Sequence, residues 1–364
     1  MSKPPLGLCH ETLLELKSYR PKQTTKIKLD ANESPFDLGA GIKSQILGSL
    51  SNVDFHRYPD PQALELRERL ADTFGGSFEE YVVGCGSDEI IALLMLTLGR
   101  TRSGLSQAAV MYPTPTFVMY RHSAQAHGLL PIEVPLLDDW SVEPDGFVSA
   151  IRRHRPNLIF LASPNNPTGR KFSEAELDAI LSATDEDMLV VIDEAYGAFA
   201  ERKHIYRESA RIGWMGTLSK VGLAAIRVGW IRLNRNLANE VDKARQPFNL
   251  NSLSQKVASL ALGICRDELM SQITSVVEER GRMTHELSSL GFSVFPSEAN
   301  FLLVRCGIGT GVDLDARTIE ASLRKEFGIG VRVFNESRLQ KDLRITVGTS
   351  TENDQLLSAL QSIL

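Results

Sequence analysis

Short apolar runs alternate with amphipathic stretches through most of the chain. Between about Leu29 and Arg245, runs rich in β-branched residues are separated by stretches with helical periodicity, such as residues 173–184. Continuous apolar runs of this length are typical of strands buried on both faces, and their alternation with helices predicts a mainly parallel sheet. The clearest predicted strands span residues 81–85, 108–112, 158–163 and 188–196.

The pattern changes after Pro247. A long helical segment is expected from about Leu253 to Leu290, followed by four short apolar runs with a helix between the second and the third. This mixture predicts a smaller α+β domain. Residues before about 28 are polar and contain prolines, so we expect an arm there. The predicted organisation is an α/β protein with an N-terminal arm (1–28), a large domain (29–246) and a small C-terminal domain (247–364).

Composition narrows the classes of function. The chain has 364 residues, of which 43% are apolar, enough to bury a substantial core. Its formal net charge of -5 and the absence of a basic stripe argue against a nucleic-acid partner. The longest apolar run begins at Ile90 and is about half the length that a membrane span needs, so we expect a buried helix and no membrane partner.

The cysteines suggest neither a disulfide framework nor a zinc site. The four of them lie far apart and form no C-x-x-C pair. This pattern fits a reducing compartment, and we therefore expect a cytoplasmic protein without a metal centre. The N-terminal stretch lacks the apolar core of a signal peptide.

Several polar residues follow predicted strands, at the sheet edge where functional groups of α/β proteins collect. Asp193 ends a β-branched run, and an acid there needs a cationic or hydrogen-bonding partner, with a structural arginine as the ordinary alternative. Asn165 and Asn166 lie in the turn SPNNPTG after the strand at 158–163. Phe117 follows another strand, where core packing is the usual explanation.

The stretch GCGSDE follows the strand at 81–85 and opens an apolar helix. A helix N-terminus after glycines can bind phosphate through its free backbone N–H groups. Capping by Ser87 or Asp88 would explain the stretch equally well. The third glycine of a dinucleotide fingerprint is missing, which makes the stretch weak support for a nucleotide.

Lys220 stands among small and apolar neighbours in GTLSKVGLAAIRVGW. A lysine can lie along apolar surface with its ammonium group in water, but a lysine in a desolvated pocket can act as a nucleophile. Arg332 and Arg344 also occupy apolar strand contexts, which suits bidentate binding of phosphate or carboxylate, with salt bridges as the alternative. Taken together, the amine, the acid, the amides, the aromatic ring and the helix N-terminus fit one cofactor, pyridoxal 5′-phosphate.

With these motifs the sequence resembles the fold-type I aminotransferases, and within them the histidinol-phosphate aminotransferase family. SPNNPTG, DEAY and LSK with its downstream arginine are typical of the superfamily, whereas LDANE, RYPDPQ, GSDE, PSEANFLL and LRITVGT point to the subfamily. The similarity runs from Leu29 to Thr349. It implies a fold-type I pyridoxal-phosphate-dependent enzyme of histidine biosynthesis that transfers an amino group from histidinol phosphate to 2-oxoglutarate, forming glutamate, and that acts as a homodimer.

The resemblance also implies roles for the matching residues. Lys220 would hold the cofactor covalently and move the α-proton, and Asp193 would pair with the pyridine nitrogen. Tyr196 and Asn166 would bond the ring oxygen O3′, and Phe117, where the family often has tyrosine, would stack on the ring. The cofactor phosphate would be held by Ser87, Asp88, Ser219 and Arg227, together with Tyr58 from the other subunit. The substrate would be bound by Arg344, Arg332, Asn32 and Tyr19.

Other functions share some of these features. An aromatic amino-acid aminotransferase or a threonine-phosphate decarboxylase would use the same lysine, acid and arginines. A nucleotide-binding oxidoreductase would use GCGSDE, although the missing glycine argues against it. A non-catalytic cofactor-binding regulator would need a DNA-binding module, for which about 28 residues before the large domain leave no room.

Overall fold

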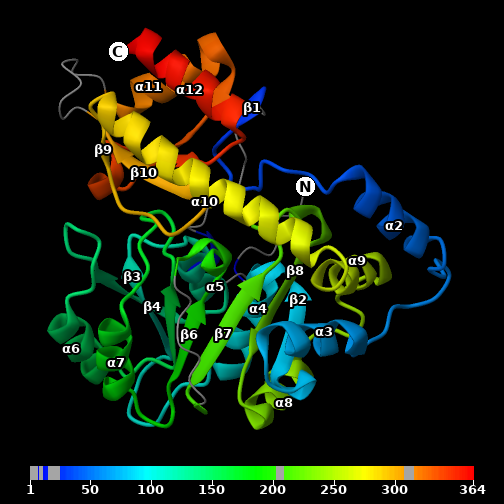
Figure 1. Ribbon diagram of the computed structural model, residues 1–364. Coiled ribbons are helices and arrows are strands. Elements are labelled where there is room, and N and C mark those ends of the chain that lie inside the picture. The colour runs from blue at the N-terminus through cyan, green and yellow to red at the C-terminus, as the bar shows by residue number, and fades with distance from the viewer. Residues whose placement is uncertain (1–6, 8–10, 15–24, 202–208, 307–314) are drawn as a thin grey trace, which may run out of the picture.

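The computed structural model describes residue 7 and residues 11–14, 25–201, 209–306 and 315–364. It has two lobes, a larger one built around a seven-stranded sheet and a smaller one built around a four-stranded sheet (Figure 1). The long helix α10 (Arg266–Ser289) runs between the two lobes. This arrangement places the ends of several strands of the larger sheet opposite the smaller lobe.

The larger sheet has the strand order β2-β8-β7-β6-β5-β3-β4. Strand β8 is antiparallel to both of its neighbours, and the remaining adjacent pairs are parallel. The predicted α/β fold with a mainly parallel sheet is therefore confirmed. The strands span Tyr81–Cys85 (β2), Ala109–Thr114 (β3), Leu130–Pro135 (β4), Leu158–Ala162 (β5), Leu189–Asp193 (β6), Ile212–Thr217 (β7) and Val228–Arg232 (β8).

The two faces of this sheet pack against different helices, because successive side chains of a strand point to opposite faces. Val191 of β6 belongs to a core shared with α4 (Gly86–Leu98), α5 (Met119–Ala126) and α8 (Arg235–Ala244). Its neighbours Val190 and Ile192 pack instead with α6 (Pro144–His154) and α7 (Glu174–Ala183). Burial on both faces explains why the sequence of β6 reads as a continuous apolar run.

The smaller lobe contains the antiparallel sheet β12-β13-β10-β9. Its core also receives side chains from α10, α11 and α12. A short parallel pair joins β1 to β11, so the end of the predicted arm enters this lobe, and Leu29 is buried in its core. The domain boundaries at residues 28 and 246 stay predictions. The elements span Ile27–Lys28 (β1), Ser293–Val294 (β9), Phe301–Arg305 (β10), Ala316–Phe327 (α11), Ile329–Gly330 (β11), Arg332–Val333 (β12), Asp342–Thr346 (β13) and Ser350–Ile363 (α12).

The long helix expected from about residue 253 to residue 290 is two helices. Helix α9 (Ser252–Leu262) ends at Gly263, and α10 begins at Arg266. Glycine has a low helix propensity, and Gly263 caps the C-terminus of α9. Cys265, the N-cap of α10, is buried, so the break lets both helices pack against the larger lobe.

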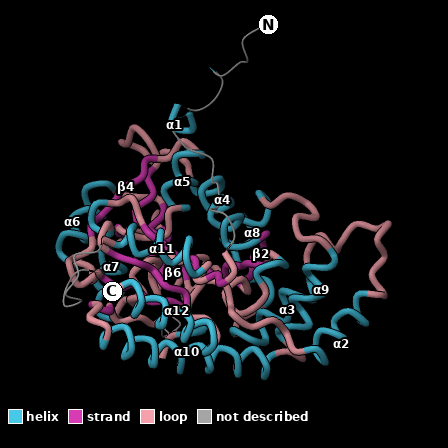
Figure 2. The backbone as a smooth tube through the Cα atoms, turned by 90° about the horizontal axis from the view of Figure 1, so that it is seen from above, coloured by secondary structure: helices cyan, strands magenta, loops and turns pink. Residues whose placement is uncertain are grey.

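Helix α1 (Glu11–Leu14) lies in the predicted arm, and α2 (Ala40–Leu50) and α3 (Leu64–Phe74) precede the first of the clearest predicted strands. Helix α1 lies beside α5, as Figure 2 shows. Helices α2 and α3 lie near α9 at one side of the larger lobe (Figure 2). Within the described part of the chain, no helix combines the length and the apolar character needed to cross a bilayer.

Candidate active site

The residues predicted from strand ends meet at one edge of the larger sheet. Asp193 is the last residue of β6, and Asn166 and Phe117 follow β5 and β3. Lys220 follows β7 in the same way. Because β7, β6, β5 and β3 are neighbours and run in parallel, the loops after them lie together at their carboxyl ends.

Asp193 is a buried carboxylate held by two hydrogen-bond donors. The side chain is only 4% exposed. The Tyr120 hydroxyl donates to Oδ2 at 2.6 Å, and the Ala195 backbone N–H donates to Oδ1 at 3.0 Å. Burial raises the pKa of Asp193 above its ordinary value, although both donors and the charge of Lys220 act in the opposite direction. Such a carboxylate is suited to hold a cationic N–H group in the same pocket.

Tyr120 is a residue of this candidate site that the sequence analysis did not single out. It lies in α5 and is fully buried. Burial, followed by the nearby charge of Asp193, raises the pKa of Tyr120, so the hydroxyl stays protonated and acts as the donor. Its ring stacks on Phe160 at 4.7 Å and meets the edge of Phe117 at 5.7 Å between centroids. Tyr120 therefore positions both the carboxylate and the ring of Phe117.

Lys220 and Tyr196 approach each other beside the carboxylate. The Lys220 side chain is half-buried, and its Nζ lies 5.6 Å from the centroid of the Tyr196 ring. The Tyr196 ring stands edge-on to Phe301 at 5.1 Å, and its hydroxyl accepts a hydrogen bond from Asn32 Nδ2 at 3.0 Å. The predicted amine and phenol are thus side by side at the strand ends.

The start of α4 forms a polar cluster with Ser219 and Arg227. Arg227 has a positive φ of 53° and donates to Asp88 Oδ2 at 3.1 Å and to Ser219 Oγ at 3.4 Å. Gly86 has a φ of 78°, and a Cβ there would overlap the Arg227 guanidinium. A helix N-terminus with free N–H groups and a neighbouring guanidinium is a suitable site for a phosphate. Ser87 is the second residue of α4 and so belongs to the same helix N-terminus.

Arg344 forms the opposite end of the site. Its side chain is 8% exposed; Nη1 donates to Asn166 Oδ1 at 2.5 Å, and Nη2 donates to the Asp30 backbone oxygen at 2.7 Å. Arg332 lies directly opposite Arg344 in the β12–β13 ladder and is exposed. Residues directly opposite in an antiparallel ladder point to the same face. Two guanidinium groups therefore share one face, one of them buried and the other open to solvent.

Some predicted site residues are not brought to this edge within one chain. Tyr58 lies in the loop between α2 and α3, is 81% exposed, and stacks on Phe248 at 4.6 Å. Tyr19 lies outside the described residues. Asn165 is fully buried in its turn, where its side chain bonds Thr116 and the Pro115 carbonyl, so of the two turn amides only Asn166 contacts Arg344.

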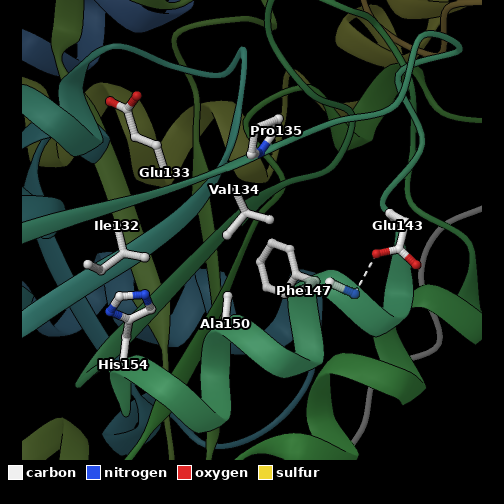
Figure 3. Close-up of a pocket in the computed structure, with 9 residues that line it drawn as sticks. Ile132, Glu133, Val134, Pro135, Glu143, Phe147, Ala150 and His154 are labelled. Carbon is white, nitrogen blue, oxygen red and sulfur yellow. Dashed lines mark hydrogen bonds between the residues drawn. The ribbon is translucent and has the colours of Figure 1, made fainter.

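A groove on another part of the larger lobe is not the candidate site (Figure 3). It measures about 340 Å³ and lies between the edge strand β4 and α6. Its acidic groups already have partners, because Glu143 caps α6 and Glu133 lies 3.5 Å from Arg121. Within the described residues, no group of three His, Cys, Asp or Glu side chains could hold a metal ion. The groove is lined by Ile132, Glu133, Val134, Pro135, Glu143, Gly146, Phe147, Ala150 and His154.

Comparisons with known proteins identify the family of the chain. The family described as "Aminotransferase class I and II" matches residues 24–360. The chain is 35% identical to the histidinol-phosphate aminotransferase of Aquifex aeolicus (strain VF5), over 96% of each protein. It is 37% identical to histidinol-phosphate aminotransferase 1 of Burkholderia lata, over 99% of each. The resemblance inferred from the sequence motifs is thus confirmed.

Solved structures give the same result. The chain resembles the crystal structure of histidinol-phosphate aminotransferase from Sinorhizobium meliloti in complex with pyridoxal-5′-phosphate, with a TM-score of 0.84 and 25% identity over 97% of each chain. A Thermus thermophilus aspartate aminotransferase mutant shares the fold, with a TM-score of 0.79 at 21% identity over 97% of this chain and 98% of the other. The chain belongs to the class I and II aminotransferase family.

Proposed function

We propose that the chain is a pyridoxal-phosphate-dependent histidinol-phosphate aminotransferase of histidine biosynthesis. It would convert L-histidinol phosphate and 2-oxoglutarate to imidazole acetol phosphate and L-glutamate. The observation that carries this proposal is the placement of Lys220 and buried Asp193 at one edge of the larger sheet, with buried Arg344 of the smaller sheet bonded to Asn166, in a chain whose full-length relatives bear that name. Membership of the aminotransferase family sets aside the nucleotide-binding oxidoreductase.

The described residues fit pyridoxal phosphate. The cofactor, when bound, supplies an electron sink whose strength depends on a protonated ring nitrogen. Asp193 would keep that nitrogen protonated, because an ionised acid with raised pKa gains from a cationic partner. Phe117 would cover one face of the ring. Asn166 Nδ2 and the Tyr196 hydroxyl would donate to O3′.

The other end of the cofactor would be held by charge and backbone groups. The N-terminus of α4, with Ser87 and Asp88, would present N–H groups to the phosphate, and Ser219 and Arg227 would add side-chain donors. Arg227 is well placed, since its side chain is 45% exposed and touches both neighbours.

Lys220 Nζ would hold the cofactor aldehyde at rest and act as the base during turnover. A free amine beside the substrate α-carbon can accept a proton and return it, which is general acid–base catalysis by a positioned side chain. The half-buried position of Lys220 beside Tyr196 supports this role, because partial burial limits solvation of the amine.

Arg344 would bind the anionic group of both substrates, a phosphate in histidinol phosphate and a carboxylate in 2-oxoglutarate. Its hydrogen bonds to Asn166 and Asp30 hold the guanidinium in one orientation, which favours bidentate binding of an oxyanion. Arg332 would assist from the same face of the sheet.

The site would be completed in a homodimer by Tyr58 of a second copy. The exposed Tyr58 ring, already ordered by stacking on Phe248, is available to a neighbouring subunit. This arrangement also explains why Tyr58 is not at the sheet edge of its own chain. We further propose a cytoplasmic location, in keeping with a small-molecule biosynthetic reaction.

A substrate comparison tests the proposal. Purified protein loaded with pyridoxal phosphate would be assayed with 2-oxoglutarate and with L-histidinol phosphate, L-phenylalanine or L-threonine phosphate. We expect the highest kcat/KM with histidinol phosphate and stoichiometric glutamate formation. A higher kcat/KM with phenylalanine, or release of CO2 from threonine phosphate as the main reaction, would overturn the assignment in favour of the alternative enzymes.

A further inference from the structure

Asn32 is a buried residue whose every polar group has a partner. It is 1% exposed and has a positive φ of 54°, a conformation that asparagine tolerates better than most residues. Its backbone N–H donates to Thr346 Oγ1 at 3.0 Å, and its backbone oxygen accepts from Asn300 Nδ2 at 3.1 Å. Asn32 is therefore enclosed between the ends of β10 and β13.

The hydrogen bonds fix which way the Asn32 amide faces. The Thr346 hydroxyl accepts from the Asn32 backbone N–H and donates to Asn32 Oδ1 at 3.1 Å. A flipped amide would deprive the Thr346 proton of this acceptor in a buried setting, which is costly. With Oδ1 turned to Thr346, Nδ2 must point to Tyr196, and it donates to the Tyr196 hydroxyl at 3.0 Å.

This donation determines where the Tyr196 proton can go. A phenol has one proton, and a phenol oxygen that already accepts from Asn32 is free to donate that proton to another acceptor. The Tyr196 ring is held edge-on to Phe301, and Lys220 lies over its face. The neighbours of Tyr196 therefore fix its ring and occupy one acceptor position of its hydroxyl oxygen before any ligand binds.

We propose that Asn32, clamped by Thr346 and Asn300, is a positioning residue that directs the Tyr196 proton to the cofactor oxygen O3′, and not a residue that lines the substrate pocket. The inference rests on the proposed function, since it needs a bound pyridoxal phosphate. Asn32 acts through Tyr196 and touches neither the substrate nor the reacting atoms.

The same geometry links both proposed O3′ donors to strand β13. Tyr196 is held through Asn32 by Thr346, and Asn166 is held by Arg344, two residues earlier on the strand. An anion that binds Arg344 therefore acts on the strand that orients both donors.

The test is a double-mutant cycle between Asn32→Asp and Tyr196→Phe, read from the bound cofactor. Aspartate has the shape of asparagine and also tolerates a positive φ. An ionised aspartate can only accept hydrogen bonds, so the Tyr196 hydroxyl would donate its proton to residue 32 and not to O3′. The cofactor oxygen O3′ would then lose one hydrogen-bond donor. It would hold more tightly the proton that it shares with the Lys220 nitrogen. We expect each single change to raise the pH midpoint of the visible absorbance by about one unit, the worth of one charge-assisted hydrogen bond.

The cycle separates positioning from a simple charge effect. If Asn32 acts through Tyr196, Asn32→Asp in the Tyr196→Phe background moves the midpoint by less than half of its effect alone. An equal shift in both backgrounds would mean that the new carboxylate acts directly by its charge, and the inference would be wrong. Midpoints unchanged in Asn32→Asp would also overturn it.

Two further variants guard against a folding artefact. Thr346→Val removes the hydroxyl that fixes the orientation of the Asn32 amide, and we expect the pH midpoint to rise by a smaller amount. An unchanged midpoint would contradict the proposed role of Thr346 in holding Asn32. Asn157→Asp is a matched control, because Asn157 also donates from a buried amide, to the Leu98 and Arg100 carbonyls at the other end of β5. It should lower the Tm of unfolding without moving the midpoint.

The outcome is distinguishable from failure of the proposed function. If the unmodified protein binds no pyridoxal phosphate and develops no visible absorbance, the proposed function itself is wrong. If it binds the cofactor and titrates normally while the Asn32 and Thr346 variants match it, only the positioning inference is wrong.

Discussion

The two ends of the candidate cofactor site differ in how completely one chain builds them. At the ring end, Asp193, Tyr196 and Asn32 are at most 6% exposed, and each is hydrogen-bonded within the chain. At the phosphate end, the Arg227 and Asp88 side chains are 45% and 43% exposed, and Tyr58 faces solvent.

The difference follows from the cost of burying polar groups. Buried donors and acceptors must find partners, so the ring end needs a complete internal network before the ligand arrives. Exposed groups are hydrated until a ligand or a second subunit replaces water, so the phosphate end can remain open. Changes at the ring end should therefore alter the chemistry, whereas changes at the phosphate end should alter cofactor affinity.

The largest effect is expected for Lys220→Ala. Removing the amine removes both the covalent anchor and the base, so transamination should fall by roughly 10⁵-fold or more. The phosphate pocket and Asp193 remain, so cofactor should still bind non-covalently. Steady-state assays and equilibrium dialysis with pyridoxal phosphate would check both results, with exposed Lys243→Ala as the control. Turnover near the normal rate would contradict the assignment of Lys220.

Asp193→Asn should lower turnover by roughly 10³-fold or more, equal to about 4 kcal/mol of transition-state stabilisation. Asparagine keeps the size of the side chain, but its one acceptor oxygen can serve only one of the two donors, Tyr120 and Ala195, and it cannot stabilise a cationic ring nitrogen. Single-turnover rates with saturating cofactor would measure the loss. A variant that retained normal rates would show that the ring end does not depend on this charge.

The same substitution should stabilise the apoprotein at neutral pH. Burial raises the pKa of Asp193, so its favourable contribution is complete below the ordinary pKa of an aspartate and is lost as pH rises through the raised value. Asparagine does not ionise and avoids that loss. The Tm of apo Asp193→Asn should therefore exceed that of the unmodified apoprotein at pH 7, and the difference should shrink on acidification. A Tm of the variant below that of the unmodified apoprotein at pH 7 would contradict the predicted direction of the change.

Arg344 and Arg332 offer a comparison of a buried and an exposed cation on one face. Arg344→Ala should raise KM for both substrates by roughly 30-fold or more, about 2 kcal/mol, because it removes a buried hydrogen-bonded charge. Arg332→Ala should raise KM by about fivefold or less, since exposed ion pairs are weak. The cofactor absorbance should change little in Arg332→Ala, whereas Arg344→Ala also frees Asn166 and should shift that absorbance, by less than it raises KM. Equal increases in KM would show that burial does not determine how much each arginine contributes to substrate binding.

Tyr58→Ala should weaken cofactor binding by roughly tenfold, the worth of one hydrogen bond to a charged phosphate. Mixing this variant with Lys220→Ala subunits tests where Tyr58 acts. A hybrid dimer would contain one site with both Lys220 and a Tyr58 supplied by the other subunit. We expect that site to regain normal cofactor affinity. Persistent weak binding in the hybrid would place Tyr58 in its own chain's site or outside both sites.

The sequence predicted which residues lie at strand ends, but not the hydrogen bonds and ring contacts that hold them in place. Asp193 and Asn166 follow apolar runs, and a parallel sheet brings such positions together, so local pattern was sufficient. Tyr120 lies in a helix, where one buried tyrosine looks like ordinary core. Thr346 contacts Asn32 across 314 positions of the chain, and no local pattern reports such a pairing.

In the fold as well, local features could be predicted from the sequence, whereas contacts between distant segments could not. The continuous apolar run of β6 predicted a buried strand, because burial on both faces leaves a direct trace in the sequence. Strand β1 has only two residues, and its partner β11 is about 300 residues away, so its pairing could not be predicted. The break at Gly263 was missed because the apolar periodicity continues on both sides.

Reduction of the holoenzyme with borohydride, followed by peptide mapping, tests the central claim most directly. The account predicts that the visible absorbance disappears on reduction and that one peptide, containing Lys220, carries the pyridoxyl group in stoichiometric amount. Label on a different lysine, or a protein that stays colourless with added pyridoxal phosphate, would contradict it.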